Sequence, residues 1–195
     1  DSSPSRGLGD VYKRQAAAGA LELAQRAFWL WANTTGGIGG YSVAIIDGKD
    51  TGYSPAKHLE GYNAIRDEVA ALAMSLGTVQ TLFIMDEMVK DNMVAAPLSW
   101  YSGWGYKSFD RGLVAEFGSA YCVDGMNALD WGLENLPEEI NTVGIIAYAG
   151  EYGDDYAAGV RKAAIANGVT VAWSYVPPVA EFDVAAALGL MLTQP

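Results

Sequence analysis

Short apolar runs alternate with segments of helical periodicity along the chain, and this alternation predicts an α/β fold. Residues 69–74 form a run with the length of a buried parallel strand, and the polar turn 75–78 follows it. From Val79 the apolar residues recur at helical spacing as far as Asp91, and a second buried run covers residues 93–96 before Pro97. Strand, helix and strand therefore follow one another here, and we expect Pro97 to end the second strand.

The same periodicity predicts further elements on both sides of this unit. Helices are expected over 16–33, 54–65, 121–136, 156–166 and from 184 onwards, and strands over 41–47, 142–147 and 170–175. Ser54 and Pro55 have the residue types of a helix cap and first turn, Asn167-Gly168 is a stop signal, and Asp183 is a candidate cap. The glycine-rich stretch 33–40 follows a helix, so it has the wrong polarity for a phosphate-binding loop.

Three regions are expected along the chain. Residues 1–15 lack helical or strand periodicity and are expected to be a non-native leader. Residues 16–140 are then one α/β lobe, and residues 141–195 begin a second one. The polar segment 137–141 is the predicted boundary.

Composition narrows the classes of function. The chain has a net charge of −11, which disfavours nucleic acid as a partner. It has one cysteine, Cys122, and one histidine, His58, so we predict no internal disulfide, no His/Cys metal site and no cofactor. His58 is expected at the surface or the boundary of the core. From the printed sequence we expect neither a signal peptide within these residues nor a membrane-spanning segment, because no apolar run is long enough to cross a bilayer.

The candidate site lies at the ends of the two central strands. Because parallel strands present ligands beyond their carboxyl ends, the turn 75–78 and the segment 98–101 should face one crevice. Thr78 is read either as a helix cap alone or as a cap that also contacts a ligand. The loop 101–118 holds aromatic residues that could stack on a ligand or anchor the loop.

Three segments together resemble one known family. They are residues 16–56 with the glycine-rich stretch, residues 75–100 from SLGT to APLSW, and residues 144–164, GIIAYAGEYGDDYAAGVRKAA. In this order they resemble the type I periplasmic solute-binding proteins of ABC importers, in the branched-chain amino acid and amide group. The resemblance implies two lobes, each a three-layer parallel sheet with helices on both faces, which close on a solute. It also implies truncation at both ends, without the first strand of lobe one and with only the start of lobe two.

The resemblance further implies a function and a set of ligand contacts. The implied contacts are Leu76, Gly77, Thr78, Leu98, Ser99, Trp100 and Tyr152. Trp100 departs from the small or hydroxylic residue expected there, and its ring could close part of the pocket or stack on a flatter solute. The implied role is non-enzymatic capture of an amino acid, amide or related carboxylate outside the cytoplasm, for delivery to an ABC permease.

Two other functions are weighed against this one. A ligand-sensing domain of a receptor or regulator uses the same fold. A flavodoxin-like enzyme fits poorly, because no nucleophile has a base partner and Asp154-Asp155 are explained as first-turn charges of a helix.

Overall fold

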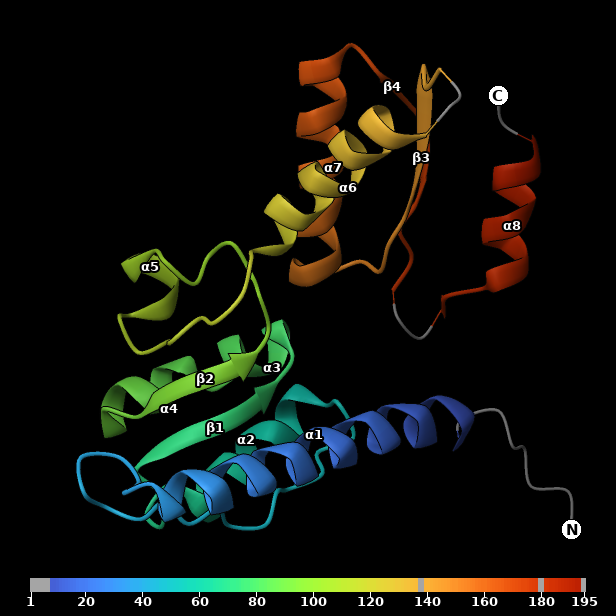
Figure 1. The fold of residues 1–195 in the computed structure, drawn as a ribbon. Helices are drawn as coiled ribbons and strands as arrows, with labels where there is room; N and C mark the ends of the chain where they lie inside the picture. The colour runs from blue at the N-terminus through green and yellow to red at the C-terminus, as the bar shows by residue number, and fades with distance from the viewer. Residues whose placement is uncertain (1–7, 137–138, 179–180, 194–195) are drawn as a thin grey trace, which may run out of the picture.

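The structure is a computed structural model of the 195-residue chain, and it describes residues 8–136, 139–178 and 181–193. It contains two α/β units, each with a pair of parallel strands (Figure 1). The elements in chain order are α1 (Leu8–Thr34), α2 (Pro55–Ile65), β1 (Ala71–Leu76), α3 (Thr78–Phe83), α4 (Met85–Asp91), β2 (Val94–Leu98), α5 (Lys107–Asp110), α6 (Tyr121–Asn135), β3 (Thr142–Ile146), α7 (Glu151–Asn167), β4 (Thr170–Tyr175) and α8 (Val184–Thr193).

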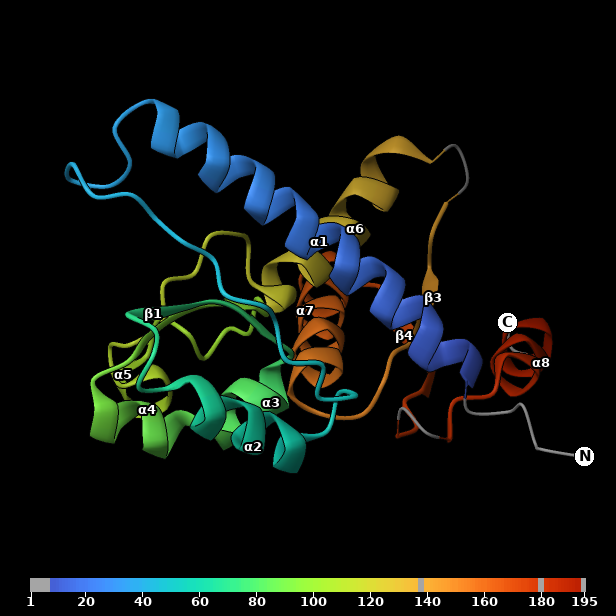
Figure 2. The same cartoon turned by 90° about the horizontal axis from the view of Figure 1, so that it is seen from below.

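The first unit has three layers. Figure 2 shows α1 on one side of β1 and β2, with α2, α3 and α4 on the other. Helix α2 supplies Tyr62 to a buried cluster with Leu72 of β1 and Met88 of α4, as the helical spacing of apolar residues requires. On the α1 side, Gln25 donates from Nε2 to the carbonyl of Ala73 at 2.7 Å, which occupies a backbone acceptor of β1.

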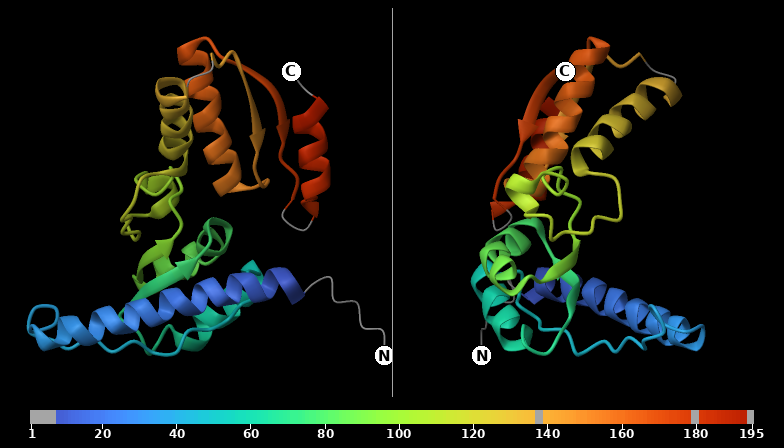
Figure 3. Two further views of the ribbon diagram at one scale, coloured as in Figure 1. Left: turned by 45° about the vertical axis from the view of Figure 1, so that its right-hand side comes forward. Right: turned by 90° about the vertical axis from the view of Figure 1, so that its left-hand side faces the viewer.

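The second unit is built in the same way around β3 and β4. Figure 3 shows these strands between α6 and α7 on one side and α8 on the other. Leu129 of α6 packs with Ala163 and Ala164 of α7 in the core. The two helices approach closely because Gly159 has no side chain, and a Cβ there would lie 1.9 Å from the carbonyl oxygen of Cys122.

The packing of α6 bears on the predicted boundary. A division at residue 140 would leave α6 with the first unit, whereas its core contacts are to α7 and to Val143 of β3. We therefore propose that the division between lobes falls between β2 and α6. Residues 137–138, within the expected boundary, lie outside the described residues.

Two expectations near the N-terminus are wrong. The helix expected from residue 16 begins at Leu8, since a formed helix extends at little cost per residue. That residues 1–15 are a non-native leader stays a prediction, and residues 1–7 lie outside the described residues. Residues 41–47 form no strand and make only an isolated bridge between Ile38 and Tyr41. Their backbone groups bond to side chains of α1 instead: Asn33 bonds both the N–H and the carbonyl of Val43, and Arg26 donates to the carbonyl of Ile45.

The central elements form with shifted boundaries. Strand β1 runs two residues further than expected, and β2 continues through Pro97, which pairs with Ser75. The expected helix after residue 78 is split at Ile84 into α3 and α4, and α7 begins at Glu151 rather than Tyr156.

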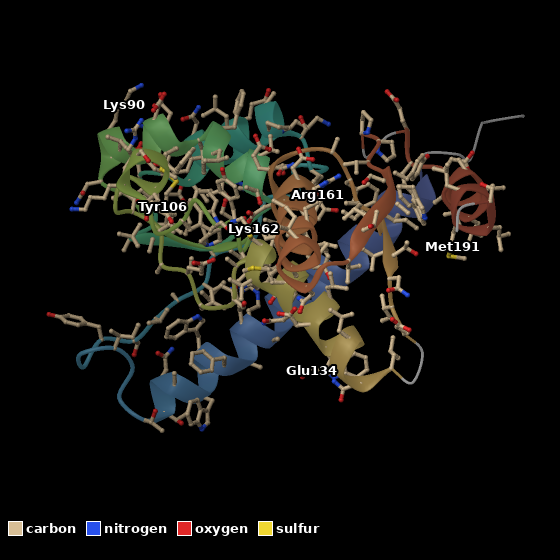
Figure 4. The ribbon with its side chains drawn as sticks, turned by 90° about the horizontal axis from the view of Figure 1, so that it is seen from above. Lys90, Tyr106, Glu134, Arg161, Lys162 and Met191 are labelled. Atoms are coloured by element: carbon tan, nitrogen blue, oxygen red, sulfur yellow. The ribbon has the colours of Figure 1, made fainter. Side chains whose placement is uncertain are left out.

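The remaining predicted elements are confirmed. Ser54 caps α2, Gly168 ends α7 with a left-handed backbone, and Asp183 accepts from the N–H of Ala185 at the start of α8. Met191, labelled beside α8 in Figure 4, is 49% exposed. Within the described parts of the chain, no helix combines the length and the apolar character needed to cross a membrane.

Candidate functional site

The two turns of the candidate site lie side by side at the carboxyl edge of one sheet. Leu76 and Leu98 are partners in the parallel register, and Gly77 donates its N–H to the carbonyl of Leu98 at 3.3 Å. Just beyond them, the hydroxyl oxygens of Thr78 and Ser99 are 2.6 Å apart. The predicted juxtaposition of these turns is confirmed, and we call Thr78 and Ser99 the hydroxyl pair.

The role expected of Thr78 at the helix start is wrong. Gly77 is the N-cap residue of α3, with φ 102° and ψ 143°, and no side chain caps the helix. Thr78 is the first helical residue, and its hydroxyl is directed at Ser99 across the turn. Glycine is required at 77 because this backbone conformation excludes side chains.

The hydroxyl pair is buried and its hydrogen bonds are satisfied. Thr78 is 2% exposed and Ser99 is 1% exposed. The indole of Trp104 donates from Nε1 to the Ser99 hydroxyl at 3.0 Å and to the Ser99 carbonyl at 3.1 Å. Trp104, one of the loop aromatics, therefore anchors the loop and covers Ser99.

A second polar network lies beside the hydroxyl pair and includes the single histidine. His58 Nε2 is 2.9 Å from the Ser75 hydroxyl, which is 2.8 Å from the hydroxyl of Thr81. Thr81 in turn donates to the carbonyl of Gly77 at 2.8 Å. Burial lowers the pKa of His58 below its usual 6.5, because the charged imidazolium loses water contact. His58 is at the boundary of the core, as expected, and hydrogen bonds through Ser75 and Thr81 link it to the turn at Gly77.

Aromatic rings connect Trp100 to Tyr152. Trp100 makes edge contacts with Phe117 and Tyr121 at centroid distances of 5.4 and 6.1 Å. Tyr121, at the start of α6, contacts Tyr152 of α7 at 5.7 Å. These two predicted site residues therefore belong to one continuous aromatic row, although they come from different units of the fold.

A cavity of about 380 Å³ opens beside these elements. It is lined by Tyr101, which follows β2, and by Gly150, Glu151, Asp154 and Asp155, which follow β3. We call the last three residues the acidic start of α7. Asp155 accepts from the N–H of Ser102 at 2.8 Å, and this bond ties the loop after β2 to α7.

The acidic start of α7 changes the ionisation of nearby groups. The pKa of Glu116 is raised by burial and then by the charge of Asp155. The pKa of Tyr101 is raised by burial and then by the charges of Asp155 and Glu151. In both groups the raised pKa favours the neutral form, which is the response expected beside the carboxylates of Glu151 and Asp155. Over the described residues, no three or more His, Cys, Asp or Glu side chains are grouped to hold a metal ion.

The sequence did not single out three residues of this region as site residues: Tyr101, Asp155 and Gln80 of α3. In the sequence, Tyr101 is marked only as the last residue of the segment that follows the second central strand. Asp155 was explained as a first-turn charge, and its bond to Ser102 joins residues 53 apart in the chain. Contacts of this range leave no periodic signal in a single sequence.

Comparison with solved structures agrees with this architecture. A fatty acid ABC transporter substrate-binding protein from Thermomonospora curvata superposes with a TM-score of 0.77 at 22% identity, over 89% of this chain and 43% of that one. The fold is that of the type I periplasmic binding proteins. A branched-chain amino acid ABC transporter protein from Thermus thermophilus with bound valine matches this type I fold with a TM-score of 0.68 at 15% identity, over 85% and 42% of the two chains. No family model matches the chain, and neither does any curated protein sequence.

A third type I protein extends the range of solutes among the structural neighbours. The solute-binding protein from Rhodopseudomonas palustris BisB5, in complex with 3,4-dihydroxy benzoic acid, has a TM-score of 0.72 at 17% identity and covers 89% of this chain and 47% of its own. The present chain thus spans less than half the length of these three type I structures.

Proposed function

We propose that this chain captures a small polar solute between its two α/β units, as the solute-binding component of an ABC importer. One observation carries the proposal: the cavity of about 380 Å³ takes its walls from the segment after β2 and the segment after β3. Ligands of open α/β sheets bind beyond the carboxyl ends of strands, and here the ends of both sheets contribute. The cavity size suits a small molecule.

The proposed solute class is an amino acid, an amide or a related carboxylate. Structural neighbours hold valine and 3,4-dihydroxy benzoic acid, which shows that this fold accommodates aliphatic and aromatic acids. Neither Trp100 nor Tyr152 lines the cavity, but each is next in sequence to a residue that does, Tyr101 and Glu151 respectively. Their rings would stack on a flat solute that extends beyond the cavity towards them. Leu76 and Leu98 set the register that holds Gly77, Thr78 and Ser99 in place.

The partner and the compartment follow from the proposed role. Solute-binding components act outside the cytoplasm and deliver to a membrane permease, so both are part of the proposal. The alternative is a ligand-sensing domain, in which the same capture would drive signalling instead of import. Binding of a solute together with stimulation of permease ATPase activity would support import, whereas binding without that stimulation would support sensing.

The test is a solute screen on this 195-residue chain by saturation-transfer NMR, which detects millimolar binding. The panel contains aliphatic amino acids, their amides and hydroxylated benzoates. At least one class should give saturation transfer, and Trp100→Ala should weaken that signal severalfold. Trp131→Ala is the matched control, because Trp131 is 60% exposed on α6 and lies outside the site. A panel without any signal, or equal effects of the two variants, would overturn the proposal.

A further inference from the structure

Gln80 presents an unexplained polar atom beside the candidate site. It lies on α3, is 2% exposed, and donates from Nε2 to the carbonyl of Tyr53 at 2.8 Å. Its Oε1 is the sole buried side-chain oxygen or nitrogen without a hydrogen-bond partner in the part of the chain that the structure describes.

The orientation of this carboxamide is set by its neighbour. If the amide were turned over, Oε1 would face the Tyr53 carbonyl, and two acceptors would repel each other at hydrogen-bond distance. In the observed orientation Oε1 is directed towards Gly77, where it lies 2.1 Å from the position that a Cβ would take. Gly77 leaves that space open to the oxygen.

No nearby hydroxyl is free to satisfy Oε1. Thr78 is paired with Ser99, and Thr81 is paired with Ser75 and the Gly77 carbonyl. A buried carbonyl oxygen without a partner costs about 1–3 kcal/mol, and native structures rarely retain one without a reason. The partner of Oε1 is therefore a hydrogen-bond donor from outside the chain, either a solute group or a water molecule.

We propose that Gln80 is a specificity-determining residue of the solute site, whose Oε1 accepts a hydrogen bond from an N–H group of the solute. This inference rests on the proposed function. An amide or ammonium group would satisfy the oxygen, whereas a carboxylate or ketone would place acceptor against acceptor. Helix α3 also contacts α7, where the acidic start disfavours an anionic group and favours an ammonium.

The ring of Tyr53 lies close to the same position. One of its ring carbons is 2.9 Å from the Cβ position on Gly77 that Oε1 approaches. Because Oε1 is buried, a solute reaches it only if a neighbouring side chain such as the Tyr53 ring moves, and Gln80 would then both hold the Tyr53 backbone and contact the solute.

The experiment compares two probes of the same shape, isobutyramide and 3-methyl-2-butanone, which differ in NH₂ against CH₃. NMR titration of the 195-residue chain should give tighter binding of the amide by about tenfold, the equivalent of one hydrogen bond. Gln80→Met has similar length but no acceptor, and it should reduce this ratio to about twofold. Gln80→Glu loses the N–H that Gln80 donates to the Tyr53 carbonyl but keeps an acceptor, so it should be less stable yet retain the preference for the amide, with isobutylammonium bound more tightly still.

The outcomes distinguish failure of the role proposed for Gln80 from failure of the proposed function. If the probes bind and Gln80→Met keeps the wild-type ratio, Gln80 only positions Tyr53 or holds a water, and this inference is overturned. If Gln80→Met does not fold, Gln80→Glu decides, because an unchanged preference between isobutylammonium and isobutyramide would equally overturn the inference. If neither these probes nor the solute panel bind the wild-type chain, the proposed function itself fails.

Discussion

The hydroxyl pair and the acidic start of α7 are both polar, but they differ in how their polar groups are satisfied. Thr78 and Ser99 are buried and bonded to each other, and Trp104 adds a second bond to the Ser99 hydroxyl. Asp155 reaches across to a backbone N–H of the other unit, while Asp154 is exposed and Glu151 is half-buried on the cavity wall.

This difference separates groups that stabilise the fold from groups that a solute can reach. Buried groups with satisfied hydrogen bonds rigidify a turn, and their loss is felt as lost stability. Carboxylates beside a cavity keep contact with water and remain available to a solute. We therefore expect substitutions at the hydroxyl pair to affect folding strongly, and those at the acidic start of α7 to act mainly on charge.

The largest effect is expected from Gly77→Ala. The backbone at φ 102° excludes a side chain, and the added Cβ would lie 2.1 Å from Gln80 Oε1. Strain and overpacking together should cost about 3 kcal/mol of unfolding free energy, measured by urea denaturation. Gly105→Ala is the control, because no atom lies within 4 Å of its added Cβ, and it should change stability by less than about 0.5 kcal/mol. Equal effects of the two variants would show that the turn is not held as described.

Ser99→Ala should have the next largest effect. It leaves the Thr78 hydroxyl without its buried partner, although Trp104 keeps its bond to the Ser99 carbonyl. The expected loss is about 1–3 kcal/mol of unfolding free energy. Ser108→Ala, at an exposed serine, serves as the control for urea denaturation and should be neutral. If Ser99→Ala leaves the unfolding free energy unchanged, the hydroxyl pair does not stabilise the turn, contrary to this prediction.

The sequence predicted the local features of this fold well. Ser54 and Pro55 start α2, and Gly168 ends α7, because caps depend on residues within one turn. Residues 41–47 have the apolar pattern of a strand, but a strand needs a neighbour to pair with. Their backbone carbonyls accept hydrogen bonds from the side chains of Asn33 and Arg26 of α1 instead of from a neighbouring strand. The apolar pattern within the segment does not indicate which partner its backbone will have.

The sequence predicts the position of the two turns of the candidate site but not the loop contacts around them. The topology rule for parallel strands brings Gly77 and Ser99 together, and it needs only the order of the elements. The closure of Ser99 by Trp104 and the bond from Ser102 to Asp155 depend on how a loop folds back. The unpartnered oxygen of Gln80 emerges only from the full set of contacts around it.

His58, in the polar network beside the hydroxyl pair, and Glu116, beside the acidic start of α7, should change the stability in opposite directions as the pH falls. The effect of His58 should be the larger. Because burial lowers the pKa of folded His58, the unfolded chain binds a proton first as the pH falls below about 6.5. Stability should therefore decrease as the pH drops from 7 through the folded pKa. Urea midpoints at pH 7 and pH 5 would measure this decrease, and His58→Gln should make it smaller. An unchanged slope in that variant would assign the acid sensitivity to other groups.

Glu116, beside the acidic start of α7, should act in the opposite direction and more weakly. Its pKa is raised above 4.5 in the folded chain, so the folded state binds the proton more tightly than the unfolded state. This contribution to stability is present below about pH 4.5 and is lost as the pH rises through the folded pKa. Glu116 is an exposed residue whose carboxyl is only partly removed from water, so the desolvation that raises its pKa is limited and the effect is small.

Two variants test the origin of this smallest effect. Glu116→Gln should remove the contribution, seen as a difference from wild type in urea midpoints between pH 4 and pH 6. Asp155→Asn should remove only part of it, because burial is the first cause of the raised pKa and the charge of Asp155 is the second. The Glu116→Gln difference should also persist in high salt, since its larger cause is burial rather than a screened charge. If Asp155→Asn removes the whole contribution of Glu116, the charge of Asp155 rather than burial is the main cause of the raised pKa. The acidic start of α7 would then affect the stability of its surroundings more strongly than we expect.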